Sequence, residues 1–205
     1  MKDLVRIAER KVKLGLLSPE AIFPDGTPQL GLVSSSILDF THKKIRGLVE
    51  VEFAADPVCL IKKEVIEKIG LMDESFSPIS GESEDYSIRM RAAGFKLFRT
   101  SRVKVVHHSG KTAAMLEKDF IYFVRMKNYL LFSLLNLPVR YVFLRFLLQF
   151  LVIFLGTKET SFSGIYLRRD FAKRFFWFTR AVKFNLINLG AIIQKRKNRV
   201  MKIWY

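Results

Sequence analysis

The stretch LIKKEVIEKIGLMDESFSPISGESEDYSIRMRAAGF, residues 60–95, sets the class of the fold. It contains two helix-like segments, and each one stops at a glycine, Gly70 or Gly94. Glycine just past the last helical turn is a common C-terminal cap. Runs rich in β-branched and aromatic residues flank the stretch at 48–53 and 96–108, as is typical of strands. This alternation of strands and helices predicts an α/β fold.

The chain upstream of this stretch adds a helix and a turn-rich segment. Residues 2–14 place Leu4, Ala8 and Val12 on one helical face, which predicts an amphipathic helix. The segment SPEAIFPDGTPQLG, residues 18–31, is rich in proline and glycine and predicts turns.

The composition argues against disordered and disulfide-stabilised proteins. Half of the residues are hydrophobic, whereas disorder needs low hydrophobicity. The one cysteine, Cys59, lies in the strand-like run VCLI (58–61) and is compatible with a reducing compartment. A formal charge of +16 combined with this hydrophobicity favours an anionic surface that accepts apolar groups. We therefore expect a membrane as partner and not nucleic acid, since long aliphatic runs have no role in binding single strands.

Most of the positive charge lies at the C-terminal end. From Pro138 onward the chain carries 14 Lys or Arg against two Asp or Glu, a net +12 of the total +16. We therefore divide the chain into a first region, 1–137, and a basic, aromatic-rich tail, 138–205. The apolar run 141–156 in the tail is shorter than the roughly 20 residues that span a bilayer. We expect it to lie in the membrane interface or to re-enter, with a true span as the alternative.

Two more segments predict helices that suit this interpretation. Residues 118–136 are apolar-rich, with Arg125 and Lys127 on the polar side. Residues 171–189 carry an apolar stripe at spacings of three and four, with cations on the other sides. Such helices can bury aromatic rings at headgroup level while their cations meet anionic lipid on the cytoplasmic face; packing against the first region is the alternative. The stripe consists of Phe171, Phe175, Phe178, Val182, Leu186 and Leu189.

Short motifs follow one another along the first region in a recognisable order. They are PDG with Gly31 a little later, LIKKEVIEKIGLMDESF with Gly70, Asp73 and Phe76, the acidic helix start before Gly94, VKVVHHSG, and FVRMKN at 123–128. In order and spacing they resemble the C-terminal half of the catalytic domain of family 2 glycosyltransferases, the inverting GT-A enzymes, and most of all the rhamnosyltransferase-like members. The resemblance extends over residues 15–130.

This resemblance implies a partial GT-A-like domain followed by amphipathic, membrane-associated helices. It implies transfer of a sugar from a nucleotide-sugar donor to a glycan acceptor, lipid-linked acceptors included, with a divalent metal, Mg²⁺ or Mn²⁺, as cofactor. The family's N-terminal half holds that metal with a D-x-D motif, and this chain contains no D-x-D. We therefore expect a truncated enzyme, a fragment of a longer chain, or one part of a split enzyme whose nucleotide-binding half is a separate chain. The alternative is a catalytically degenerate, membrane-bound interaction protein derived from the same fold.

An inverting transfer needs a base that takes the proton of the acceptor hydroxyl as its oxygen attacks. The family assigns this role to the Asp of an "E-D" pair, six residues before a helix Arg that precedes Gly by five. Arg89 stands five before Gly94, so Ser83 occupies the position of the base, between Glu82 and Asp85.

A register slipped by two residues makes Glu84 and Asp85 the acidic pair, with Arg91 as the arginine. The slip would rotate the helix by about 200° and scramble its buried face, so we prefer the first register. The residues alone also allow a structural interpretation: Ser83 caps a helix over 84–94, the acids suit its dipole, and Asp85 pairs with Arg89.

The candidate site residues follow from the resemblance. Glu82, Glu84 and Asp85 are candidates for catalysis, and Ser83 and Arg89 for substrate binding. Asp56 is a further candidate for substrate binding. The family usually places a small Gly-Ala-like pair at this position, near the acceptor, and Asp56-Pro57 departs from that pattern. His107 matches a histidine that helps to hold the metal or the diphosphate. Alternation along a strand sends His107 and His108 to opposite faces, and a lone histidine is often structural.

Overall fold

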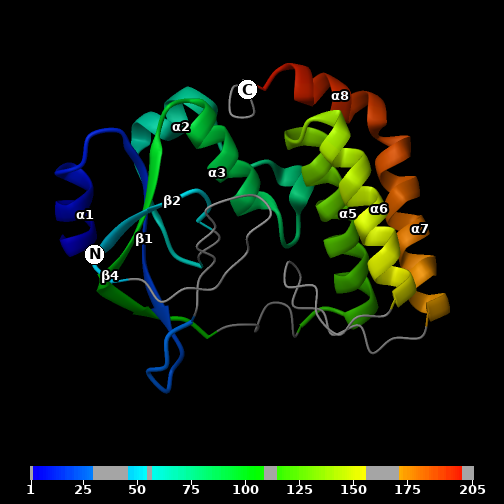
Figure 1. Cartoon of the computed structure of the whole chain (residues 1–205). Coiled ribbons are helices and arrows are strands. Elements are labelled where there is room, and N and C mark those ends of the chain that lie inside the picture. The colour runs from blue at the N-terminus through cyan, green and yellow to red at the C-terminus, as the bar shows by residue number, and fades with distance from the viewer. Residues whose placement is uncertain (1, 30–45, 55–56, 109–114, 156–170, 200–205) are drawn as a thin grey trace. The chain divides into compact units, whose positions relative to one another are not determined.

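The computed structural model describes residues 2–29, 46–54, 57–108, 115–155 and 171–199, and over these ranges the protein is a mixed α/β structure with one four-stranded sheet and seven α-helices (Figure 1). The chain forms two compact units: unit 1 is Met1–Asp73 with Ser83–Lys111, and unit 2 is Glu74–Glu82 with Thr112–Tyr205. The elements are α1 (Lys2–Glu9), β1 (Leu14–Ile22), β2 (Leu48–Val51), β3 (Leu60–Ile61), α2 (Lys63–Ile69), the 3-10 helix η1 (Glu74–Phe76), α3 (Glu82–Ala92), β4 (Lys96–Val106), α5 (Lys118–Asn136), α6 (Val139–Leu155), α7 (Phe171–Ile187) and α8 (Leu189–Lys197).

Unit 1 is a sheet covered on both faces. Its strand order is β2-β4-β1-β3, with β1 and β4 parallel and the two outer strands antiparallel to their neighbours. Helix α1 lies on one face, and α2 and α3 lie on the other (Figure 1). Both faces of the sheet are covered where β1 and β4 are buried, at residues 14–19 and 97–100. The predicted α/β class is confirmed.

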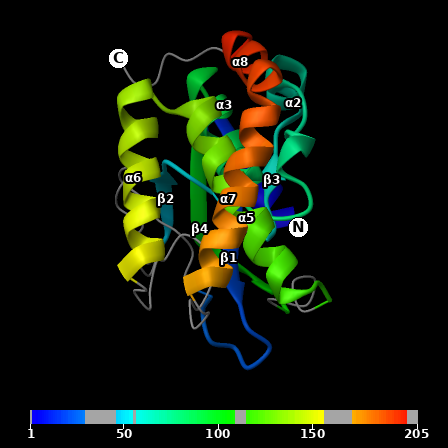
Figure 2. The same ribbon diagram turned by 90° about the vertical axis from the view of Figure 1, so that its right-hand side faces the viewer.

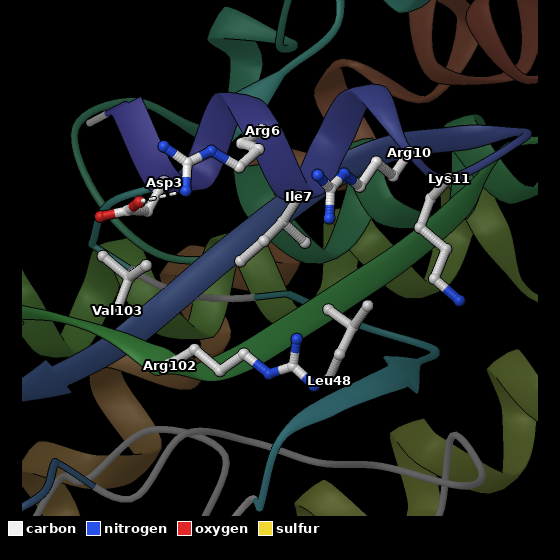
Figure 3. A pocket seen from close by; sticks show the side chains of 8 residues that line it. All are labelled: Asp3, Arg6, Ile7, Arg10, Lys11, Leu48, Arg102 and Val103. Carbon is white, nitrogen blue, oxygen red and sulfur yellow. Dashed lines mark ion pairs between the residues drawn. The ribbon is translucent and has the colours of Figure 1, made fainter.

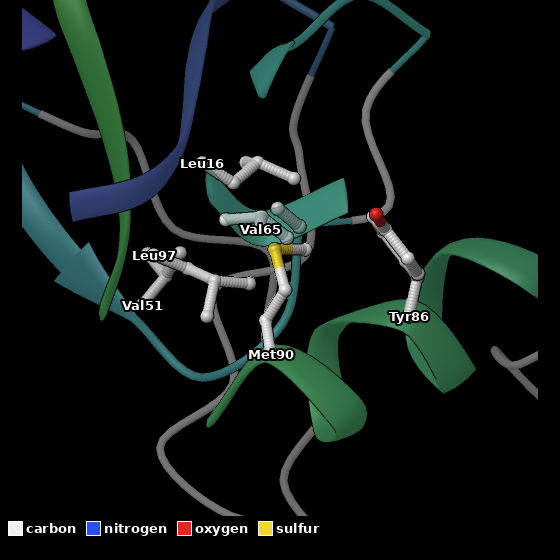
Figure 4. Close-up of a cluster of buried hydrophobic side chains, with 7 residues drawn as sticks. Leu16, Val51, Val65, Tyr86, Met90 and Leu97 are labelled. Carbon is white, nitrogen blue, oxygen red and sulfur yellow. The ribbon is translucent and has the colours of Figure 1, made fainter. Parts of the chain in front are cut away.

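The two faces of the sheet have separate cores because side chains alternate along each strand. On β4, Leu97 joins the core under α2 and α3, whereas the next residue, Phe98, joins the core under α1. Figure 4 shows Met90 of α3 and Val65 of α2 meeting Leu97 in the first of these cores. Each core therefore ties one helical layer to the shared sheet.

The turns predicted over 18–31 are wrong for the first five residues. Strand β1 continues to Ile22, and Glu20, Ala21 and Ile22 each pair with a residue of β4. Pro19 is tolerated because β3 pairs only with Leu16 and Leu17, so the other edge of β1 needs no amide donor at this proline. The turn comes afterwards, where Gly26 has a positive φ of 82°.

The other segment boundaries differ by a few residues. Helix α1 ends at Glu9, and the side chain of Val12 is 85% exposed, so only Leu4 and Ala8 of the predicted face are buried. The predicted strands and helices around Gly70 are confirmed, and β4 is one continuous strand.

Unit 2 is a group of helices arranged around α5 (Figure 2). Tyr122, Met126 and Leu130 on α5 form a core with Phe178 and Ala181 on α7. The predicted helix over 118–136 is confirmed residue for residue. No helix within the described ranges is both long enough and apolar enough to cross a bilayer. Since α5 belongs to unit 2, the compact units do not divide at 137/138, and the functional division there stays a prediction.

Candidate functional site

The acidic stretch before Tyr86 forms the first turn of α3. The helix begins at Glu82, two residues before the predicted start, so the prediction that Ser83 caps the helix is wrong. Ser83 lies inside the first turn, and its carbonyl accepts a hydrogen bond from Ser87 Oγ at 2.7 Å. Ser87 Oγ in turn accepts the backbone amide of Ala54 at 3.2 Å, which anchors α3 to the end of β2.

Asp85 is the most buried carboxylate of this turn. Its side chain is 0% exposed, and its Oδ2 accepts a hydrogen bond from Nε of Arg89 at 3.0 Å. The pair expected one helical turn apart is confirmed. Arg89 is therefore fixed on one side by the carboxylate, and its remaining N–H groups point away from Asp85.

Those remaining donors bind backbone carbonyls at the C-terminal end of α2. Arg89 donates to the carbonyls of Ile69 and Leu71, both at 2.8 Å, and Tyr86 donates its hydroxyl to the carbonyl of Gly70 at 2.8 Å. The last carbonyls of a helix have no partner within it and carry its partial negative charge, so a guanidinium suits this place. The Arg89 guanidinium also lies 4.8 Å from the centre of the Tyr86 ring, and burial raises the pKa of the Tyr86 hydroxyl.

This arrangement separates the three candidate carboxylates by what they can reach. A general base must come within hydrogen-bond distance of the acceptor hydroxyl. Asp85 is enclosed and holds Arg89 in place, which makes it a structural anchor. Glu84 of unit 1 and Glu82 of unit 2 are only half-buried. Oε2 of Glu82 is buried and has no hydrogen-bond partner within the described residues.

His107 follows the last residue of β4 and is held by Gln29. The Gln29 amide donates to the carbonyl of His107 at 2.6 Å, and its Oε1 lies 2.8 Å from Nδ1 of the ring. Because an amide oxygen accepts only, Nδ1 of the ring is the donor in this contact. His107 is half-buried and His108 exposed, as strand alternation predicts.

The described residues do not fit a divalent metal. Among them, no three His, Cys, Asp or Glu side chains gather closely enough to hold an ion. His107 would contribute one nitrogen, whereas Mg²⁺ and Mn²⁺ prefer several oxygen ligands. Asp56, the remaining candidate, lies outside the described residues.

A polar clamp on α5 was missed from the sequence. Lys127, predicted on the polar side, is 7% exposed, and its Nζ donates to the carbonyls of Ser75 and Ser77 at 3.1 and 3.3 Å. The neighbouring Asn128 amide lies within 2.5–2.8 Å of three carbonyls in the same loop, those of Phe76, Ile79 and Ser80. The motif FVRMKN therefore fixes loop 74–81, and burial lowers the pKa of Lys127. The available signal was the polar pair Lys127-Asn128 in an apolar-rich helix.

Helix α6 has its polar and apolar sides reversed relative to a water-soluble helix. Arg145 and Gln149, the only two polar residues from 142 to 155, are buried against α5, with exposures of 5% and 7%. Arg145 lies over the rings of Tyr129 and Phe132, with its Cζ 5.0 and 5.9 Å from their centres. Around the rest of the helix, large apolar side chains are exposed: Phe143, Leu144, Phe146, Leu147, Leu148 and Leu151.

Helix α7 shares part of this reversal. Its buried positions include the polar Arg174 and Asn185, and the Asn185 amide donates to the carbonyl of Lys127 at 3.1 Å. The predicted apolar stripe does not form the buried face: within it only Phe178 is buried. The exposed apolar side chains of this helix are Phe171, Phe175, Phe176, Phe184, Leu186 and Ile187. We call the exposed apolar residues of α6 and α7 together the apolar face of unit 2.

Comparison with known proteins gives no matching family model, no matching curated protein and no matching solved structure.

Proposed function

We propose that the protein docks on a membrane through the apolar face of unit 2 and presents there a glycosyltransferase-like α/β unit. The unit would act in transfer of a sugar from a nucleotide-sugar to a glycan acceptor, lipid-linked acceptors included, together with a separate chain that carries the nucleotide-binding half. The observation that carries the proposal is the reversed helix α6, with Arg145 and Gln149 inside and leucines and phenylalanines outside.

The reversal indicates apolar surroundings because both of its halves are unfavourable in water. Burying a leucine or phenylalanine side chain stabilises a protein by about 1.5–3 kcal/mol, and α6 leaves six such side chains exposed. The buried positions of α6 are instead occupied by the guanidinium of Arg145 and the amide of Gln149, and removing either group from water costs free energy. In contact with lipid tails the same arrangement is favourable, because the apolar side chains are solvated and the polar ones face protein.

Charge supports an anionic lipid surface. Exposed cations accompany the apolar face, among them Arg140 on α6 and Lys173, Arg180 and Lys183 on α7. Each Lys or Arg near an anionic leaflet contributes about 1 kcal/mol, and anionic lipid is concentrated on the cytoplasmic leaflet. The Arg180 guanidinium lies 5.3 Å from the centre of the Trp177 ring, a pairing suited to the headgroup level.

The transferase part of the proposal is supported by the order in which the motifs occupy the elements. Gly70 ends α2, the acidic turn opens α3, His107 follows β4, and FVRMKN lies on α5. Of the acidic residues, Glu84 and Glu82 are half-buried and reachable, so they are the candidates for taking the proton of the acceptor hydroxyl. The nucleotide-sugar and its Mg²⁺ or Mn²⁺ would be held by the separate chain.

The alternative, a catalytically degenerate membrane-bound interaction protein, is favoured by one observation. Asp85, which follows the position of the base in the motif, is buried and bound to Arg89, whose guanidinium donates to a carbonyl at the end of α2. In that case the α/β unit would serve as a binding surface and the acidic turn as a structural anchor.

Membrane docking is tested by flotation of the full-length protein with vesicles that contain anionic lipid. Leu147→Gln with Leu151→Gln on α6 should weaken partition about 100-fold, since each leucine withdrawn from lipid costs about 1.4 kcal/mol or more. Val12→Gln, at another exposed apolar residue, should leave partition unchanged. Equal partition of all three proteins would refute docking through α6.

Sugar transfer is tested by adding the product of an adjacent reading frame and measuring binding of nucleotide-sugars with Mg²⁺ or Mn²⁺. The proposal expects binding and turnover only in the joint sample, with turnover reduced at least 100-fold by Glu84→Gln or Glu82→Gln. Binding without turnover, unaffected by either substitution, would support the interaction protein instead.

A further inference from the structure

A second candidate site lies in unit 1, on the face of the sheet that α1 covers, whereas the acidic turn of α3 belongs to the other face. A groove of about 420 Å³ opens there between α1 and strands β2 and β4 (Figure 3). This volume falls within the usual range of 300–1,000 Å³ for ligand sites. The residues that line it, called the basic groove below, are Asp3, Arg6, Ile7, Arg10, Lys11, Leu48, Arg102 and Val103.

The charge of the groove is strongly one-sided. Four cationic side chains line it against one carboxylate, Asp3, which gives a net charge of +3. Asp3 is already paired with Arg6, whose Nη1 lies 3.6 Å from Oδ1. The Lys11 ammonium lies 5.9 Å from the centre of the Phe98 ring, which holds it beside the sheet. Among the residues that line the groove, Asp3 is the one carboxylate, so the groove offers Arg10 and Arg102 no second one.

An irregularity in β4 forms one wall of the groove. The pairing with β1 jumps from Pro19 opposite Thr100 to Glu20 opposite Lys104, so residues 101–103 have no partners in β1. Such bulges re-aim side chains and are common beside functional sites. Here the bulge places Val103 against the core under α1 and leaves Arg102 exposed at the rim (Figure 3).

The bulge is held in place by hydrogen bonds that continue the sheet. The Ser101 amide donates to the carbonyl of Gly47 at 2.9 Å, and its Oγ accepts the Gly47 amide at 2.8 Å. The Arg102 amide donates to Oγ1 of Thr100 at 3.2 Å. These hydrogen bonds of β4 therefore fix the position of Arg102. Its cation lies across the groove from Arg10 and Lys11, which follow α1.

We propose that the basic groove binds a phosphate group that is attached to an apolar portion. Guanidinium groups present paired N–H donors that match phosphate oxygens, and three net positive charges suit a group with two or more negative charges. The floor of the groove consists of Ile7, Leu48 and Val103, which gives the apolar portion a surface to contact. The phosphate is either that of a lipid headgroup or that of a soluble compound.

The test uses the full-length protein and two probes that separate these sources. Titration calorimetry measures binding of inorganic pyrophosphate and of monomeric dihexanoyl phosphatidic acid, with dihexanoyl phosphatidylcholine as the reference lipid. We expect saturable binding that weakens at least tenfold in Arg10→Gln and in Arg102→Gln. Lys63→Gln, the same charge change at an exposed site on α2, should leave binding unchanged. Thermal unfolding checks that each variant is folded.

The outcomes of the titrations distinguish the two sources of the phosphate and test the proposal itself. Groove-dependent binding of the phosphatidic acid alone supports the lipid headgroup as source, and groove-dependent binding of both probes supports recognition of the phosphate itself. Groove-dependent binding of pyrophosphate alone supports a soluble phosphate and refutes the contact of an apolar portion with the floor. Equal weakening in Lys63→Gln and the groove variants shows a general charge effect and overturns the proposal, as does the absence of saturable binding of either probe.

Discussion

Asp85 and Arg89 lie one turn apart on α3, and the 3.0 Å hydrogen bond between Oδ2 and Nε directs the rest of the guanidinium to the carbonyls of Ile69 and Leu71 at the end of α2. The carboxylate is fully buried, whereas Arg89 keeps a small exposed part. Two helices of unit 1 are therefore fixed by one acidic residue that the sequence places among candidate catalytic groups. Its role in stability is separable from any role in chemistry.

Asp85→Asn should lower the free energy of unfolding by roughly 2–3 kcal/mol, because it leaves a largely buried guanidinium without its counter-charge. Glu84→Gln, the neighbouring acid with a half-buried side chain, should change it by less than about 0.5 kcal/mol. Urea unfolding of the full-length protein measures both. Equal stability of Asp85→Asn and the wild type would contradict the anchoring role.

In unit 1, the features that depend on neighbouring residues in the sequence, such as the ends of helices, were predictable. Gly70 adopts a positive φ of 74° and Gly94 one of 89°, and these glycines correctly mark the ends of α2 and α3. The extension of β1 through Pro19 was not predictable, because pairing with β4 overrides the local turn preference of proline. That pairing joins residues about 80 positions apart, and single-sequence patterns carry no information on it.

The contact between Asp85 and Arg89 was predictable, whereas the surroundings of the pair were not. The pair formed by Asp85 and Arg89 follows from helical spacing alone, but the carbonyls that Arg89 binds belong to another helix. The sequence also did not predict which side of α6 is buried. Its two polar residues lie four apart on one face, and a pattern rule for water-soluble helices places that face outside. The structure places Arg145 and Gln149 inside because α5 offers aromatic rings and a thioether there.

Asn128→Ala should destabilise unit 2 by roughly 3 kcal/mol. The substitution removes the side-chain amide that contacts the carbonyls of Phe76, Ile79 and Ser80, and a buried carbonyl left without a donor costs about 1–3 kcal/mol. Asn188→Ala is the matched control, because that amide donates to one carbonyl in an exposed place. Hydrogen exchange in residues 74–81 should accelerate in the first variant only. Unchanged exchange would mean that contacts other than those of Asn128, such as the bonds from Lys127, hold the loop.

Tyr122 should make the protein sensitive to alkaline pH. Burial raises the pKa of its hydroxyl to about 12, above the ordinary value of 10.0. Between these two values the unfolded chain loses the proton while the folded chain keeps it, so stability is full below pH 10 and falls as the pH rises towards 12. The loss amounts to roughly 2–3 kcal/mol.

The measurement is the urea midpoint from pH 9 to 12 in wild type and Tyr122→Phe, with Tyr141→Phe as the control. The difference between wild type and Tyr122→Phe isolates this group, since other alkaline effects are common to both. We expect the curve of Tyr122→Phe to fall less steeply above pH 10 and that of Tyr141→Phe to follow the wild type. Parallel curves for all three proteins would show that Tyr122 ionises equally in the folded and unfolded states.

Gly15→Ala should destabilise unit 1 although the residue lies in a strand, where glycine is usually the poorer choice. An added Cβ would stand 2.7 Å from Cβ of Phe95 and 3.0 Å from Cγ2 of Val65, so the core under α2 must shift, at a cost of about 1–3 kcal/mol. Gly190→Ala on α8 meets nothing within 4 Å and should be neutral or stabilising by up to about 1 kcal/mol. Thermal unfolding of the two variants tests whether Gly15→Ala lowers stability while Gly190→Ala does not. A stable Gly15→Ala would mean that the strand and α2 separate easily, and hence that the core shown in Figure 4 is not what holds α2 against the sheet.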